Sequence, residues 1–263
     1  MVRLSVVIPV RDEAEKVGPL TAEVDAALRG RYDYEIVFVD DGSRDGTGAR
    51  IADASRRNRR VRLVQHAEPC GQSTAIWNGV REARGEWIAT LDGDGQNDPT
   101  DIPRLMRVLS AATADERLGM VVGHRVSRQD GWLRRIASPI ANAVRAWMLR
   151  DATPDSGCGL KVFLRERYLD LPYFDHMHRF LPALMLRSGY RVRSEPVNHR
   201  PRERGRSKYG VLDRLWIGVA DLLGMFWLMR RERRPSSVRV ASAPEAAAED
   251  ERTSAPPAAM GGG

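Results

Sequence analysis

Short apolar runs alternate with stretches of helical spacing over the first half of the chain, and this alternation constrains the fold most. The runs are Leu4–Val10, Glu35–Val39, Val61–Gln65, Glu86–Leu91 and Leu118–Gly123. Apolar residues at helical spacing separate the first four, over Val17–Leu28, Thr47–Arg57 and Ser73–Ala83. Strands joined by single helices form βαβ units, whose sheets are mostly parallel and covered on both faces. The sequence therefore predicts an α/β fold with a Rossmann-like sheet flanked by helices.

Two acidic loops follow predicted strands at the edge where open α/β sheets bind their ligands. They are Asp40–Asp45 and Asp92–Asp98, and the second begins Asp92-Gly93-Asp94-Gly95-Gln96. Two carboxylates directly after a buried strand suit Mg²⁺ or Mn²⁺ shared with a diphosphate. The glycines beside them let the backbone bend around such a ligand. Asp-Gly pairs are also common in solvated turns, so this motif alone leaves both interpretations open. Thr100, at the end of the loop, is expected to be the N-cap of the next helix.

The second half is less regular. Apolar spacing predicts a helix over Trp132–Leu149, kinked at Pro139, and strands over Gly159–Leu164 and Val192–Asn198. Val211–Met229 is long and apolar but carries charged residues. A membrane span needs about 20 largely uncharged residues, so we expect an amphipathic helix there. From Pro235 onward the chain is rich in Ala, Pro, Ser and Glu and is predicted to be disordered.

The basic residues are concentrated in two segments. The net charge is +7, from 42 basic and 35 acidic residues. Residues 125–150 carry +5 and residues 200–234 carry +6, which leaves −4 for the remainder. An anionic partner met at one place would explain this distribution. A nucleic acid is one such partner, but the basic segments are interleaved with apolar helical stripes and contain no recognised nucleic-acid motif, so we expect none.

The cysteines and histidines give weaker signals. Cys70 and Cys158 lack the C-x-x-C spacing and are too few for a disulfide framework, so we expect buried thiols in a reducing compartment. The histidines, including His176 and His178, show no convincing metal-ligand spacing and are interpreted as packing or polar contacts.

Several motifs occur in a fixed order along the chain. Pro9-Val10-Arg11-Asp12-Glu13, Val39-Asp40-Asp41-Gly42-Ser43 and Asp92-Gly93-Asp94-Gly95-Gln96 each follow a predicted strand, Arg125 closes another, and Arg202–Tyr209 fits the pattern Arg-x-x-Gly-x-Ser-Lys. Over about residues 3–210 the sequence resembles the family-2, GT-A-fold glycosyltransferases. Within them it looks like the polyprenyl-phosphate sugar transferases typified by dolichol-phosphate mannose synthase.

The resemblance implies a role for each matching residue. Pro9, Arg11 and Glu13 would line the nucleotide pocket, Val39 and Asp41 would hold base and ribose, and Asp92, Gly93, Asp94 and Gln96 would hold the sugar-proximal end. Asp94 and Gln96 would bind Mg²⁺ or Mn²⁺, Arg202 and Lys208 would meet the donor, and Arg125, Arg134 and Arg135 would meet the acceptor phosphate. Asp92, Asp94, Arg125 and Arg202 would be the catalytic residues.

The chain departs from the mannose synthases at two places, which leaves the donor open. Arg11 stands where they carry an aromatic residue, and the stretch from Asp155 ends at Lys161 where theirs ends in Arg. GDP-mannose and a UDP-sugar, including an anionic one, are both compatible with these residues.

The implied activity is inverting, metal-dependent transfer of a sugar from a nucleotide sugar to polyprenyl phosphate. A phosphate monoester is already anionic at pH 7, because its second pKa is ~6, so this acceptor needs no general base. The alternative is a family-2 transferase acting on a hydroxyl acceptor in cell-envelope glycan or lipid synthesis.

The resemblance and the patterning together divide the chain. We expect a GT-A domain over 1–210, with a nucleotide-sugar half (1–124) and an acceptor half (125–210). A membrane-proximal helix and basic cluster over 211–234 and a tail over 235–263 would follow. The expected location is the cytoplasmic face of the cell membrane, with peripheral attachment to its anionic surface.

Overall fold

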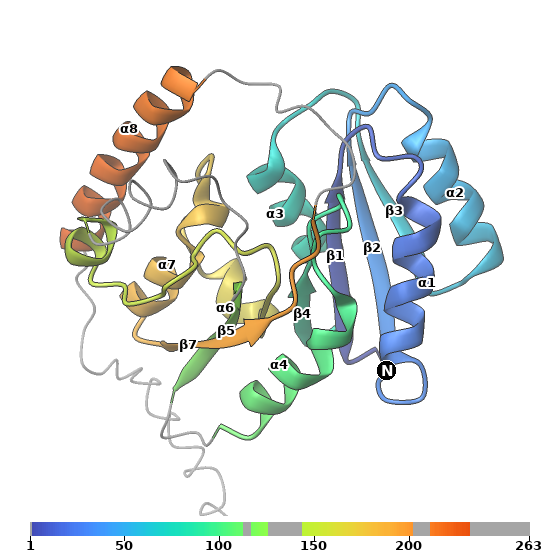
Figure 1. The fold of residues 1–263 in the computed structure, drawn as a ribbon, viewed down its shortest axis with the longest axis horizontal. Coiled ribbons are helices and arrows are strands. Elements are labelled where there is room, and N and C mark those ends of the chain that lie inside the picture. The colour runs from blue at the N-terminus through green and yellow to red at the C-terminus, as the bar shows by residue number, and fades with distance from the viewer. Residues whose placement is uncertain (1, 113–116, 126–143, 202–210, 232–263) are drawn as a thin grey trace, which may run out of the picture. The chain divides into compact units, whose positions relative to one another are not determined.

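The computed structural model describes residues 2–112, 117–125, 144–201 and 211–231, with side chains from 218 onward in the last range (Figure 1). The chain divides into two compact units, Met1–Arg231 and Glu232–Gly263, and the described residues belong to the first. Several predictions therefore fall outside the described residues: Arg134, Arg135, Arg202, Lys208, most of the Trp132–Leu149 helix and the tail from 235. The end of that predicted helix, residues 144–149, is helical.

The described residues form a seven-stranded sheet in the order β3-β2-β1-β4-β6-β5-β7. The strands are β1 (Leu4–Val10), β2 (Tyr34–Asp41), β3 (Val61–His66), β4 (Trp87–Thr90), β5 (Leu118–Arg125), β6 (Lys161–Leu164) and β7 (Arg191–Val197). Strand β6 runs antiparallel to β4 and β5, and the other neighbours pair in parallel. The predicted mostly parallel α/β sheet is confirmed.

Helices cover both faces of this sheet because alternate residues of the buried strands point to opposite sides. Leu4, Val6 and Ile8 of β1 pack with α1 (Val17–Leu28), α2 (Thr47–Arg57) and α4 (Ile102–Ser110). Val7 and residues of β2 pack on the other face, and the helices there are α3 (Gln72–Glu82), α6 (Arg165–Leu169), α7 (Leu181–Arg187) and α8 (Val211–Arg230). Among the described residues, two short 3-10 helices, η1 (Pro99–Asp101) and η3 (Met177–Arg179), lie between these elements.

The start of η1 corrects one prediction. Asp98, not Thr100, is its N-cap: the Asp98 carboxylate accepts hydrogen bonds from the Thr100 N–H (3.0 Å) and hydroxyl (2.7 Å). The prediction was wrong because a carboxylate two residues earlier already takes the capping position. Asp101 at the end of η1 accepts a hydrogen bond from the Asn198 N–H at 2.7 Å, which connects this turn to the segment after β7.

Helix α8 packs against the same core as α3 and α7. Met225 is 1% exposed within that core, and Leu222, Leu228 and Met229 pack beside it. A polar contact joins His176 Nδ1 to Asp221 Oδ2 at 2.9 Å. Val219, Leu223 and Trp227 are exposed on the same helix. Of the helices described, α8 included, none is both long and apolar enough to cross a membrane.

We predict that Met225→Ala separates the buried role of α8 from its exposed face. Truncating this buried side chain should lower the free energy of unfolding by about 2–5 kcal/mol. Leu223→Ala, at a position 57% exposed, should change it by no more than about 0.5 kcal/mol. Urea unfolding monitored by circular dichroism measures both. Equal midpoints for the two variants would contradict the packing of α8 described above.

Candidate active site

Polar contacts hold the loops after β1 and β2 against each other. The Asp12 N–H donates to Ser43 Oγ (2.9 Å), and the Arg44 N–H donates back to Asp12 Oδ1 (2.9 Å). The Glu13 N–H donates to Thr47 Oγ1 (2.9 Å) at the start of α2. These reciprocal bonds fix the backbone that carries Arg11, Glu13 and Asp41.

A cleft of about 1040 Å³ opens at the carboxyl ends of β1, β2 and β4. Seven of the predicted site residues line it together: Pro9, Arg11, Glu13, Asp41, Asp92, Gly93 and Asp94. The rest of the cleft wall comes from α3, the region around β6, η3 and α8. The residues from these parts include Gln72, Ile76, Arg145, Asp155–Gly157, Gly159, Lys161, His178–Leu181, Gly218, Val219 and Leu222. The cleft thus extends from the acidic loop to apolar residues of α8.

Asp92 is held at the base of the cleft by neutral and charged partners. Gln72 Nε2 donates to Asp92 Oδ1 at 3.0 Å, and the Asp92 N–H donates to the buried Asn97 side chain at 2.9 Å. Desolvation raises the pKa of Asp92, and the neighbouring Asp94 charge raises it further. Lys161 lies nearby on β6, where burial lowers its pKa and its ammonium donates to the Cys158 carbonyl. The site therefore concentrates negative charge that a cation would stabilise.

Two glycines make this arrangement sterically possible. A Cβ at Gly93 would lie 2.6 Å from Val10 Cγ1 and 2.7 Å from the Pro9 carbonyl oxygen, so the acidic loop can approach β1 only without one. A Cβ at Gly159 would overlap the Asp92 carboxylate itself. The Gly159 carbonyl also accepts a hydrogen bond from Thr90 Oγ1 at 2.6 Å, which fixes the segment before β6 against β4.

The donor set at the acidic loop fits Mg²⁺ or Mn²⁺, since it consists of carboxylate and amide oxygens with one imidazole nearby. Gln96 Nε2 donates to the Arg200 carbonyl at 3.2 Å, which leaves Oε1 as the amide atom able to bind a metal. His199 Nε2 lies 3.3 Å from the same amide. The structure brings Gln96 and His199 together at the acidic loop. The binding of a cation by Asp94 and Gln96 stays a prediction.

His199 makes a polar contact with Gln96, the kind of contact that the sequence interpretation expected of the histidines, but the sequence did not place it at the acidic loop. An isolated bridge between Asn97 and His199 brings it to the acidic loop. Its position directly after the strand that precedes the Arg202–Tyr209 motif is the only sequence signal that could have marked it.

Of the predicted site residues that the structure describes, three are not part of the cleft wall: Val39, Gln96 and Arg125. The Val39 side chain is fully buried in the core, so it offers no side-chain contact to a ligand. The Arg125 guanidinium forms a two-pronged ion pair with Asp155, with Nε–Oδ2 at 2.6 Å and Nη2–Oδ1 at 2.7 Å. Asp155, not Arg125, lines the cleft. The role of Arg125 toward the acceptor phosphate stays a prediction.

His178 connects η3 to the start of α3. Its Nδ1 lies 2.7 Å from Ser73 Oγ, and the Ser73 hydroxyl accepts a hydrogen bond from the His178 N–H at 3.2 Å. Burial lowers the pKa of His178 to about 3, with Lys161 and Arg179 adding to the effect. The imidazole is therefore neutral near pH 7, which agrees with the predicted polar contact.

Comparison with known proteins identifies the family. The sequence profile described as Glycosyl transferase family 2 matches residues 5–170, more than half of the chain. The chain belongs to glycosyl transferase family 2. The motifs that line the cleft from Pro9 to Asp155 all lie within the matched residues.

Curated relatives of this family 2 glycosyltransferase have names that state an acceptor. It is 36% identical over 237 residues to the dodecaprenyl-phosphate galacturonate synthase of Rhizobium johnstonii, covering 88% of this chain and 69% of the relative. It is 35% identical over 211 residues to the undecaprenyl-phosphate 4-deoxy-4-formamido-L-arabinose transferase of Edwardsiella ictaluri, covering 80% of this chain and 63% of that one. The chain thus spans about two thirds of the length of these relatives.

Solved structures share the fold of this glycosyltransferase. Glucosyl-3-phosphoglycerate synthase from Mycobacterium tuberculosis, in complex with Mg²⁺ and uridine diphosphate, matches with a TM-score of 0.64 at 18% identity, covering 87% of this chain and 79% of that one. A mannosyltransferase from Pyrobaculum calidifontis, in complex with GDP-Man and Mn²⁺, matches with a TM-score of 0.61 at 21% identity, covering 89% and 66%. At these identities the likeness shows the GT-A fold alone.

We predict that Gly159→Ala damages the site while Gly157→Ala does not. The added methyl group overlaps the Asp92 carboxylate in the first case, whereas at Gly157 its nearest neighbour, Arg125 Nη2, lies 3.7 Å away. Displacing a catalytic group by ~1 Å can cost on the order of 100-fold, so kcat/KM should fall at least about tenfold in Gly159→Ala. Steady-state kinetics on both variants measures this. A loss of similar size in Gly157→Ala would mean that Asp92 placement is not the cause.

Proposed function

We propose that this glycosyltransferase moves a sugar, with inversion, from a nucleotide sugar to polyprenyl phosphate. The observation that carries this proposal is that one cleft contains both the acidic loop and the apolar residues Val219 and Leu222 of α8. A lipid phosphate needs polar contacts for its head group and apolar contacts for its chain, and this cleft offers both. The names of the curated relatives, which contain dodecaprenyl phosphate and undecaprenyl phosphate, support the same acceptor class.

A divalent cation is part of the proposal. Asp94 and Gln96, as the sequence predicts, together with His199 would hold Mg²⁺ or Mn²⁺. When bound, such an ion neutralises charge on the leaving nucleoside diphosphate. Asp92, fixed by Gln72 and Asn97, would orient the sugar-proximal end of the donor.

The ion pair with Arg125 removes one cleft carboxylate, that of Asp155, from the groups that could act as a base for a hydroxyl acceptor. Both of its carboxylate oxygens accept hydrogen bonds from Arg125, and charge-assisted pairs of this geometry are strong. A hydroxyl acceptor would require a base able to take its proton, whereas a phosphate monoester would not. Arg179 in the cleft wall supplies a further positive charge on the side of η3 and α7.

Attachment to an anionic membrane surface is proposed from the exposed face of α8. Val219, Leu223 and Trp227 are 42%, 57% and 59% exposed. The Arg230 guanidinium lies 4.2 Å from the centre of the Phe226 ring, and that of Arg231 lies 5.6 Å from the centre of the Trp227 ring. Apolar side chains beside arginines are typical of helices that lie in a membrane interface. The cytoplasmic face of the membrane remains part of this proposal.

We predict that Asp94→Asn removes turnover and leaves the fold intact. The substitution removes a metal-site charge from a loop outside the core, and losing one such electrostatic group should lower kcat by about 100-fold or more. Asp53→Asn, in the exposed Asp53–Arg56 pair of α2, is the control and should retain activity. The assay follows sugar transfer to polyprenyl phosphate, with polyprenol in parallel. Equal rates with polyprenol would reject the acceptor class, and an active Asp94→Asn would reject the site.

We predict that replacing both Leu223 and Trp227 by Ser weakens binding to anionic liposomes by at least about tenfold, because burying each such side chain is worth about 1.5–3 kcal/mol. Tyr173→Ser is the control, because Tyr173 is 46% exposed but lies outside α8, and it should leave binding unchanged. Cosedimentation at low and high salt measures both variants. Failure of the unmodified chain to bind at low salt would reject membrane attachment, without bearing on turnover.

A further inference from the structure

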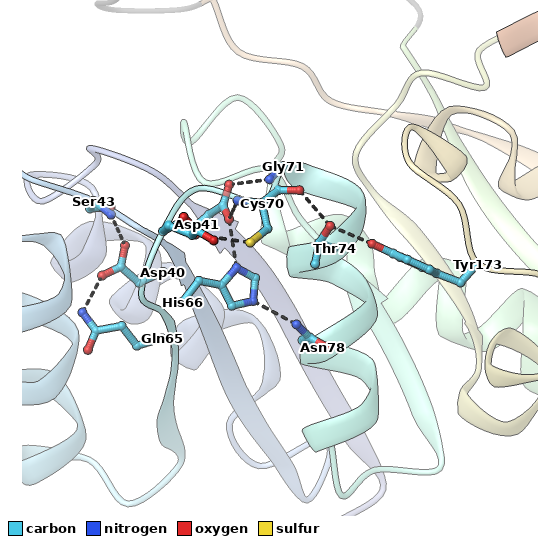
Figure 2. Close-up of polar contacts among 11 residues, drawn as sticks. Asp40, Asp41, Ser43, Gln65, His66, Cys70, Gly71, Thr74, Asn78 and Tyr173 are labelled. Atoms are coloured by element: carbon cyan, nitrogen blue, oxygen red, sulfur yellow. Dashed lines mark hydrogen bonds and ion pairs between the residues drawn. The ribbon is translucent and has the colours of Figure 1, made fainter.

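A second set of side chains able to bind a metal lies where β2 and β3 end, and it shares no residue with the acidic loop. It consists of Asp41 at the end of β2, His66 at the end of β3 and Cys70 in the loop before α3 (Figure 2). One ligand atom from each of the three lies within 4.8 Å of the others. Cys158 is buried as predicted, but Cys70 is exposed, because it lies in a loop and not in the core. Its thiol is therefore accessible to an ion from solvent.

Hydrogen bonds pre-organise two of these ligands. Asp41 accepts from the Cys70 N–H (2.7 Å) and the Gly71 N–H (2.9 Å), so its carboxylate is fixed by the backbone of the Cys70 loop. His66 Nδ1 lies 2.9 Å from Asp41 Oδ1, and His66 Nε2 lies 3.0 Å from Asn78 Nδ2 on α3 (Figure 2). The imidazole is thus held on both sides, with Nδ1 facing the carboxylate. Ligands held in this way lose little entropy when a metal binds.

We propose that Asp41, His66 and Cys70 form a binding site for Zn²⁺ or a divalent ion of similar softness. A thiolate and an imidazole select such ions over Mg²⁺, which prefers oxygen ligands. Three protein ligands leave a fourth tetrahedral position for water or another small ligand. The donor chemistry therefore differs from that of Asp94, Gln96 and His199 at the other site.

Proton balance is consistent with this ion. The ion takes the place of the proton between His66 Nδ1 and Asp41 Oδ1, and that proton moves to Nε2. The proton stays on Nε2, and this N–H donates a hydrogen bond to Asn78 Oδ1 after the amide turns over, since an amide offers a donor and an acceptor. The Cys70 thiol loses its proton to solvent as the S–metal bond forms. One proton is released for each ion bound, and no oxidant or reductant is needed.

Occupation of this site would compete with the nucleotide. This consequence rests on the proposed function, in which Asp41 contacts the base and ribose of the donor. Asp41 and Gly71 both line the cleft. An ion bound to Asp41 would therefore take up space that the nucleotide needs and neutralise the carboxylate that would contact it. Zn²⁺ should then inhibit transfer competitively with the nucleotide sugar, whereas Mg²⁺ or Mn²⁺ should not.

Titration with Co²⁺, a spectroscopic substitute for Zn²⁺, tests the site directly on the full chain with any affinity tag removed. We expect a cysteine-thiolate charge-transfer band that Zn²⁺ abolishes. Cys70→Ser retains the backbone N–H that holds Asp41 but should lose the band, and its Zn²⁺ affinity should fall at least about 100-fold, more than outer-sphere changes usually cost. Asp94→Asn, which removes a ligand of the other site, should keep the band.

The outcomes separate this proposal from the proposed function. No thiolate band, or a band that survives in Cys70→Ser, would overturn the Asp41–His66–Cys70 site whatever the enzyme's activity. His66→Asn is a second variant, and a Zn²⁺ affinity equal to that of the unmodified chain would also overturn it. If the band depends on Cys70 but transfer activity is absent from the unmodified chain, the metal site stands and the proposed function fails.

Discussion

The acidic loop at the end of β4 imposes the constraint on which the rest of the site depends. Asp92 and Asp94 carry like charges two residues apart, at the end of a buried strand where water is partly excluded. Such a pair is costly unless its surroundings supply positive charge, hydrogen-bond donors or a cation. The fold supplies Lys161 from β6 and Gln72 from α3, and Gly93 and Gly159 give the loop room to approach its neighbours.

The parts of the fold set by local pattern could be predicted from the sequence. Apolar runs identified the strands, and their order with single intervening helices identified the parallel sheet. Because the carboxyl ends of parallel strands share one edge, motifs after β1, β2 and β4 could be expected at one cleft, and Pro9, Asp41 and Asp92 do line it. The predictions that lie outside the described residues, such as Arg202 and Lys208, remain predictions.

Contacts between distant segments could not be predicted in the same way. His199 reaches Gln96 across 103 residues, and Asp155 pairs with Arg125 across 30. Neither pairing leaves a periodic signal in the sequence. The contact of His199 depends on the course of the chain after β7, and that of Asp155 depends on how the chain returns from β5 to the antiparallel strand β6. The N-cap of η1 was also predicted wrongly, because Asp98 and Thr100 are both suitable capping residues and the structure uses Asp98. Cys70 was placed in the core by residue type, although its loop position determines its exposure.

Two cation sites of different donor chemistry, each with one carboxylate in the wall of the same cleft (Asp94 and Asp41), would make the enzyme sensitive to which metal is available. Affinity for nitrogen and oxygen ligands rises from Mn²⁺ to Zn²⁺, so Asp94, Gln96 and His199 cannot by themselves exclude Zn²⁺. During turnover, the preference of these residues for Mg²⁺ or Mn²⁺ would depend on the diphosphate that shares the ion and on the abundance of each ion in the cell. Asp41, His66 and Cys70 lack that diphosphate and contribute a thiolate, so Zn²⁺ gains most there. The nucleotide end of the cleft would therefore respond to Zn²⁺ even while the acidic loop holds its usual ion.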